Sequence, residues 1–143
     1  MLIQEQPLRR VIQAIVEATG STPDEAELVT DHLVRANLAG HDSHGVGMIP
    51  TYVDNLHKGG LKPNTAARLV TDTGSMLLYD GGRGYGQRVA FEAMTAAIER
   101  CRDTGLTLLA LRNAHHIGRI GTYGEMAIAA GLVSLHFVNV TDH

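Results

Sequence analysis

The sequence has few of the features that identify secreted, membrane or nucleic-acid-binding proteins. It contains one cysteine, Cys101, and no tryptophan, and because a lone cysteine cannot form an internal disulfide we expect a reducing cytoplasm. No apolar run approaches the roughly 20 residues of a membrane span, and the N-terminus lacks a signal-peptide pattern. The net charge of −3 predicts no basic surface for nucleic acid or an anionic membrane.

The hydrophobic pattern that is present predicts a mixed α/β domain in which helices come first. Helical spacing predicts helices over 7–18, 22–38 and 48–56, with Val11 facing inward and with Thr22 and Glu25 forming a capping box. The next apolar runs predict a hairpin of two strands, 67–71 and 76–79.

A helix over 87–102 is expected next, with Phe91 facing inward. It is followed by a strand over 106–111, a helix over 122–130 and a strand over 132–138. Because both strands are continuously apolar, we expect them to be buried on both faces. The order of elements divides the chain into a helical segment, 1–60, and an α/β part, 61–143.

The first candidate site is the loop from His41 to Gly45. An imidazole can donate or accept a proton near neutral pH, and Asp42 can fix the tautomer of His44 or raise its pKa. The alternative is that Asp42 and Ser43 cap the next helix and that His44 is a surface residue. The loop alone favours this alternative.

The second candidate site is the loop from Asn113 to Gly121, between a predicted strand and a predicted helix. Ligands of open α/β sheets bind beyond the carboxyl ends of strands, and the start of the helix offers N–H groups to an anion. Arg119 adds a planar donor for a carboxylate or phosphate. An ordinary turn with polar side chains explains the loop equally well.

Two further patterns give weaker signals. The series Gly82, Gly84 and Gly86 does not have the spacing of a dinucleotide fingerprint and favours a turn of residues that adopt positive φ. The eight histidines do not show zinc-ligand spacing, so no metal is expected. The alternative is a metal-binding module, in which the histidines of the two loops converge on one point: His41, His44, His115 and His116.

Two stretches resemble the signatures of one enzyme family. Asp42-Ser43-His44-Gly45-Val46, followed by Pro50 and Tyr52, resembles a signature of the malate/L-lactate dehydrogenase family, and 113–118 resembles a second. The similarity extends to Asn139 and includes Asp80-Gly81 and Gly86-Gln87. It implies the N-terminal part of an L-sulfolactate dehydrogenase-like fold, which is not a Rossmann domain.

The resemblance also implies an activity. Family members transfer a hydride between NAD or NADP and C2 of a 2-hydroxy or 2-keto acid, and a homodimer is expected. His44 matches the proton donor or acceptor, Ser43 a neighbour that orients it, and His116 a second acid or base. The residues that match cofactor contacts are His44, Gly118, Arg119, Ile120 and Asn139.

The substrate-binding residues depart from the family pattern. Met48 stands where many members carry an arginine that would clamp the substrate carboxylate. We therefore expect Arg119 to take over part of the anion binding, and a pocket with Met48 to suit an apolar or aromatic acid. The length of the chain leaves open the alternative of a truncated, inactive fragment.

Overall fold

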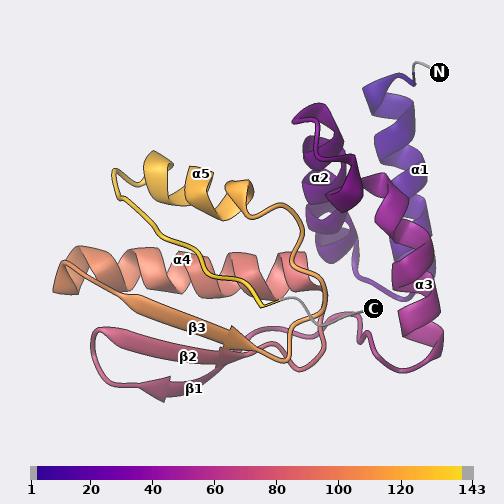
Figure 1. The fold of residues 1–143 in the computed structure, drawn as a ribbon. Helices are drawn as coiled ribbons and strands as arrows, with labels where there is room; N and C mark the ends of the chain where they lie inside the picture. The colour runs from indigo at the N-terminus through magenta and orange to yellow at the C-terminus, as the bar shows by residue number, and fades with distance from the viewer. Residues whose placement is uncertain (1–2, 140–143) are drawn as a thin grey trace.

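The computed structural model describes residues 3–139, which form a helical part followed by an α/β part (Figure 1). The helical part consists of α1 (Glu5–Ala18), α2 (Pro23–Leu38) and α3 (Ile49–His57), with two short 3-10 turns between α2 and α3. The α/β part follows in the order β1 (Arg68–Asp72), β2 (Met76–Asp80), α4 (Gly86–Thr104), β3 (Leu108–Arg112) and α5 (Gly121–Ala129). The end of the predicted second unit, 140–143, lies outside the described residues.

The helical part has its own hydrophobic core. Side chains spaced by three or four residues form one apolar face on each helix, and these faces bury Val16 of α1, Leu33 of α2 and Tyr52 of α3 together. Ala26 and Val29 of α2 are buried in the same core. The prediction for Val11 is wrong, because it lies at the edge of the apolar stripe and is exposed.

Helix α2 begins as predicted, but its capping box does not form. Thr22 is the N-cap and Pro23 occupies the first turn, yet no side-chain cap hydrogen bond is present at this helix start. Glu25 is instead buried and accepts a hydrogen bond from the backbone N–H of Asn64. A long-range ion pair to Arg88, at 3.1 Å, also holds this carboxylate away from the helix end.

The predicted hairpin and mixed sheet are confirmed. β1 pairs antiparallel with β2, with an irregularity between Leu69 and Thr71, and β2 pairs parallel with β3. Parallel neighbours need a crossover connection, and α4 provides it by running alongside the sheet, with α5 next to it (Figure 1). A second core lies between α4, α5 and β3, with Met94, Tyr123 and Ala127 buried in it. Phe91 of α4 is exposed, contrary to the prediction.

Two predictions about the later strands are wrong. In β3 the residues alternate between exposed and half-buried, because only the side of Leu109 and Leu111 packs on the helices and β3 is an edge of the described sheet. The stretch 132–138 is extended but pairs with no strand among the described residues. Leu132 packs against the second core, but the other apolar side chains have no neighbouring strand and stay exposed, as Phe137 does at 93%.

None of the helices formed by residues 3–139 combines the length and the apolarity that a bilayer crossing requires.

Candidate active site

A short loop after α2 positions His44, and Asn37 of α2 holds this loop. The Asn37 side chain accepts a hydrogen bond from the backbone N–H of Val46 at 2.8 Å and donates one to Asp42 at 2.6 Å. Gly45 passes so close to Asn37 that a Cβ atom there would overlap its amide. Asp42 therefore stabilises the loop through its hydrogen bond with Asn37. This contact differs from the predicted one, in which Asp42 fixes the tautomer of His44.

Ser43 is the side chain that contacts the His44 ring. Its hydroxyl lies 2.9 Å from His44 Nδ1, within hydrogen-bond distance. A serine hydroxyl can donate to a ring nitrogen or accept from it, so this contact orients the ring in either tautomer. This contact supports the orienting role that the family resemblance implies for Ser43.

The loop that carries His116 begins at the end of β3 and is held by the glycine-rich turn before α4. Asn113 adopts φ 52°, a left-handed conformation that asparagine tolerates, and its side chain donates to Asp80 at 3.0 Å. Backbone hydrogen bonds then join the two loops, from Arg83 to Asn113 at 2.7 Å and from His115 to Gly84 at 3.2 Å.

The glycines of this turn have two different functions. Gly82 has φ +56°, as a turn of positive φ predicts. Gly86 does not have a positive φ, but a Cβ atom there would overlap the carbonyl oxygens of His115 and His116. The glycine thus allows α4 to start directly against the histidine loop, which the sequence pattern did not reveal.

The two loops bring His44 and His116 together. Their ring centroids are 5.2 Å apart, and both rings line one cavity of about 850 Å³. Gly118, Ile120 and Asn139, three of the predicted cofactor contacts, line the same cavity. Apolar side chains of α4 and β3 form much of the remaining wall: Ala90, Met94, Leu109 and Leu111.

Buried polar groups lie behind His116. The Tyr52 hydroxyl of α3 is 2.7 Å from His116 Nδ1, and the Gln87 amide of α4 donates to that hydroxyl at 2.6 Å. Burial raises the pKa of Tyr52, so this hydroxyl keeps its proton. The two residues belong to the signature stretches, but their contact with His116 could not be seen from spacing.

The structure does not bring the two predicted substrate-binding residues to the cavity. The Arg119 guanidinium forms an ion pair with Glu125 of α5, and Arg119 is absent from the lining of the cavity. Met48 packs against the core of the helical part. In this arrangement neither side chain is placed to contact a carboxylate in the cavity.

Arg112, which is not among the predicted site residues, is the arginine that lines the cavity in the described part of the chain. It ends β3, where alternation turns its side chain outward, and its guanidinium lies 3.1 Å from Asp80. The side chain is 54% exposed, so it can contact a ligand from solvent. Its position at the carboxyl end of a parallel strand is the signal that would have identified it.

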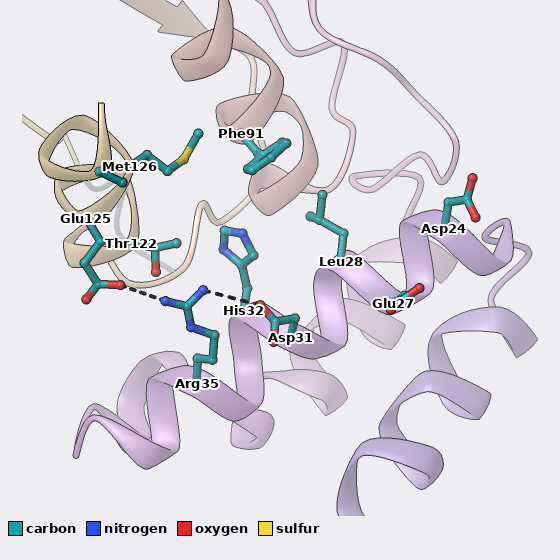
Figure 2. A pocket seen from close by; sticks show the side chains of 11 residues that line it. Asp24, Glu27, Leu28, Asp31, His32, Arg35, Phe91, Thr122, Glu125 and Met126 are labelled. Carbon is teal, nitrogen blue, oxygen red and sulfur yellow. Dashed lines mark hydrogen bonds and ion pairs between the residues drawn. The ribbon is translucent and has the colours of Figure 1, made fainter. Parts of the chain in front are cut away.

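A second hollow, of about 660 Å³, lies between α2, α4 and α5 (Figure 2). Its rim is mainly acidic, with Asp31 and Glu125 both paired to Arg35. His32 points into it, but burial lowers the pKa of this histidine to about 4, which makes it a poor proton carrier near neutral pH. His32 is the histidine that lines this hollow among the described residues, so the hollow offers no imidazole suited to proton transfer near neutral pH.

The metal-binding alternative gains no support from the described residues. Within 3–139, no three histidine, cysteine, aspartate or glutamate side chains are placed so that they could hold a metal ion. His44 and His116 instead have contacts with Ser43 and Tyr52.

Comparison with known proteins identifies the family. The sequence model of the malate/L-lactate dehydrogenase family matches residues 3–143. The chain belongs to this family. It is 50% identical to hydroxycarboxylate dehydrogenase B of Escherichia coli (strain K12) over 135 residues, which are 94% of this chain and 37% of that protein. It is 41% identical to an L-lactate dehydrogenase of Cupriavidus necator over 142 residues, which are 99% of this chain and 41% of the relative.

Solved structures confirm the predicted fold. The malate dehydrogenase of Pyrococcus horikoshii OT3 matches with a TM-score of 0.86 and 34% identity, over 92% of this chain and 38% of that one. The sulfolactate dehydrogenase of Methanocaldococcus jannaschii matches with a TM-score of 0.85 and 31% identity, over 90% and 38% of the two chains. The chain spans 37% to 41% of the length of these four relatives.

Proposed function

We propose that this chain supplies the proton-transfer half of the active site of an NAD- or NADP-dependent 2-hydroxyacid dehydrogenase. The observation that carries the proposal is the convergence of His44 and His116, from two loops far apart in sequence, on one cavity. Relatives in the same family are named for lactate, malate and sulfolactate, which supports a small 2-hydroxy or 2-keto acid as the substrate.

The residues of the cavity fit a nicotinamide. The volume of the cavity, about 850 Å³, lies within the range of small-molecule sites. The apolar wall of the cavity suits the flat face of the nicotinamide ring. Gly118 lines the cavity with φ +77° and stands at the position where the family resemblance implies a cofactor contact. When bound, the reduced cofactor would supply the hydride that adds to C2 of the keto acid.

The chain's own residues would handle the proton. Reduction of a keto group leaves a negative charge on oxygen, which needs a proton from a group that titrates near neutral pH. His44 is proposed as this donor, with Ser43 orienting its ring, and it would take the proton back during oxidation. His116, whose ring centroid lies 5.2 Å from that of His44, is proposed to contact the same oxygen.

Arg112 is proposed as the carboxylate contact, in place of Arg119 and Met48. A guanidinium binds a carboxylate through two parallel hydrogen bonds, and Arg112 can do so by exchanging Asp80 for the substrate. We expect Arg112→Ala to raise the KM for a 2-keto acid by about tenfold or more. Arg119→Ala is the matched control and should leave KM unchanged, and the assignment is wrong if the two variants behave alike.

The remaining expectations concern the assembly. The single cysteine supports a cytoplasmic location, and the family resemblance supports a homodimer. Sedimentation of the purified protein tests the second expectation directly.

Cofactor binding tests the proposed function. NADH and NADPH fluorescence is titrated with the protein, and hydroxypyruvate or phenylpyruvate is then added. We expect saturable binding and oxidation of one cofactor, with His44→Gln slowing oxidation by about 10²- to 10⁴-fold and the exposed His57→Gln as the control. Absence of binding would favour the alternative of an inactive fragment, and turnover at the normal rate in His44→Gln would refute the role of His44.

A further inference from the structure

Two side chains that the proposed chemistry does not use connect His116 to the interior. Gln87, in the first turn of α4, is 0% exposed, and Tyr52 of α3 is 1% exposed. The Gln87 amide nitrogen lies 2.6 Å from the Tyr52 hydroxyl, which lies 2.7 Å from His116 Nδ1. A continuous hydrogen-bonded path therefore leads from a buried amide to a ring that lines the cavity.

The chemistry of the three groups gives this path a direction. An amide nitrogen has hydrogens but no lone pair to offer, so Gln87 donates and the Tyr52 oxygen accepts. Because burial raises the pKa of Tyr52, the hydroxyl keeps its single hydrogen. That hydrogen points to His116 Nδ1, which must then accept it, so a neutral His116 carries its own proton on Nε2.

We propose that Gln87 and Tyr52 are positioning residues that hold the His116 ring and select the tautomer protonated at Nε2. The proposal rests on the proposed function in one respect, because the selected tautomer has a role only if the cavity binds a keto acid. The tautomer matters to that function because an N–H donor, and not a nitrogen lone pair, stabilises a carbonyl oxygen on which negative charge develops.

Packing fixes both members of the path. The Tyr52 ring lies edge-on to Tyr85, with centroids 5.8 Å apart, and to His115, with centroids 5.2 Å apart. Gln87 lies against Gly118, where an added Cβ atom would be 3.7 Å from the amide nitrogen. Groups locked in this way can hold a site residue within the small tolerance that chemistry requires.

The Gln87 amide can present either its nitrogen or its oxygen to Tyr52. The tautomer of His116 should therefore change when a mutation replaces the donor at this position by an acceptor. If the Gln87 oxygen faced Tyr52, the hydroxyl would donate to it and would accept from an N–H at His116 Nδ1. A glutamate at position 87 has only acceptor oxygens when ionised. When its carboxyl is ionised, Gln87→Glu is therefore expected to favour the opposite tautomer, protonated at Nδ1.

Nitrogen-15 NMR of the histidine rings tests the proposal without any ligand. The 143-residue chain is labelled at histidine, and the tautomers are read from long-range proton–nitrogen correlations at about pH 9, where an ordinary imidazole is neutral. We expect His116 to favour Nε2–H over Nδ1–H by at least about tenfold, a stronger preference than that of the exposed His57 ring. Tyr52→Phe should bring the ratio for His116 to that of His57, whereas Tyr79→Phe, the control, should leave it unchanged.

The outcomes are decisive in both directions. A His116 that is mainly Nδ1–H, or that matches His57 in the unmodified chain, overturns the proposal, and this result needs no variant to fold. An unchanged ratio in Tyr52→Phe overturns it as well. The cofactor titration is a separate measurement, so a selected tautomer without NADH or NADPH binding would refute the proposed function and leave the positioning role standing.

A turnover assay distinguishes a positioning role from a purely structural one. Tyr52→Phe keeps the ring and its packing but removes the hydroxyl. We expect kcat to fall by about tenfold with little change in KM, because the bound acid would meet a mixture of tautomers. A change confined to KM would contradict this expectation.

Discussion

His32 lies on α2 with its ring turned into the hollow between α2, α4 and α5 (Figure 2). It is 6% exposed, and its ring centroid is 6.0 Å from that of Tyr123. Desolvation is the largest cause of its lowered pKa of about 4, with Arg35 adding to it and Asp31 opposing it. The folded protein therefore holds this histidine neutral over most of the acidic range.

The lowered pKa makes stability depend on pH. In the unfolded chain His32 titrates near 6.5, so between about pH 6.5 and 4 the unfolded state binds a proton that the folded state refuses, and stability falls as pH falls. We expect this group alone to reduce the free energy of unfolding by about 2 kcal/mol between pH 7 and pH 5. Urea denaturation at the two pH values should show a smaller loss in His32→Leu than in the unmodified chain. The exposed His57→Leu is the control, and an equal loss in all three proteins would contradict the prediction.

Single residues also show where sequence reasoning succeeded and where it failed. The chemistry of His44 and His116 is visible locally, but each loop alone also allowed a structural interpretation, and the resemblance to the family's two signatures is what selected them. The direction of a long side chain is not visible in the sequence. Arg119 could face either a ligand or Glu125, and in the structure it forms an ion pair with Glu125. The position of Arg112 at the end of a strand is also visible locally, but strand alternation fixes the direction of its side chain only once the buried face of β3 is known.

Between elements, Glu25 connects α2 to α4 and to the segment before β1. One carboxylate oxygen accepts from the backbone N–H of Asn64 at 2.8 Å, and the other pairs with Arg88 at 3.1 Å. Arg88 also pairs with Glu92, whose second oxygen accepts from the backbone N–H of Ala67. The helical part and the α/β part are thus joined through buried and half-buried polar contacts.

Removal of this carboxylate should destabilise the fold. Glu25→Ala leaves the part-buried N–H of Asn64 without its acceptor and removes one of the two carboxylates that pair with Arg88, which costs about 1–3 kcal/mol. Glu27→Ala, on the exposed side of the same helix, should change stability by no more than about 0.5 kcal/mol. Chemical denaturation measures both, and equal midpoints for the two variants would show that Glu25 does not have this role.

The elements themselves were predictable where a local signal determines them. The period of apolar residues in α1, α2 and α4 and the turn residues between β1 and β2 depend only on nearby sequence. Burial of β3 and the state of 132–138 depend on which neighbours flank them, and an apolar run predicts a strand without specifying its partner. The capping box failed similarly, because Arg88 and Asn64 compete for Glu25 from distant parts of the sequence.

Across the whole molecule, apolar exposure is concentrated after α5. Val133, Leu135 and Phe137 are 97%, 83% and 93% exposed, and 136–139 also line the His44 cavity. Apolar groups gathered in this way favour association. We expect the 143-residue chain to associate as its concentration rises, with light scattering as the measurement. Replacing these three residues by serine should reduce association more than Leu38→Ser on α2, and an equal effect would place the contact elsewhere.

The turn before α4 and the loop after β3 are joined by main-chain hydrogen bonds, from Gly81 to Arg112, from Arg83 to Asn113 and from His115 to Gly84. Bonds of this kind do not depend on which side chains the two loops carry. Substitutions at exposed loop positions could therefore change substrate preference while the His44 and His116 rings keep their positions. Adding or deleting a residue would shift the ladder and move the histidines, so a directed-evolution library here should vary composition and keep loop length constant.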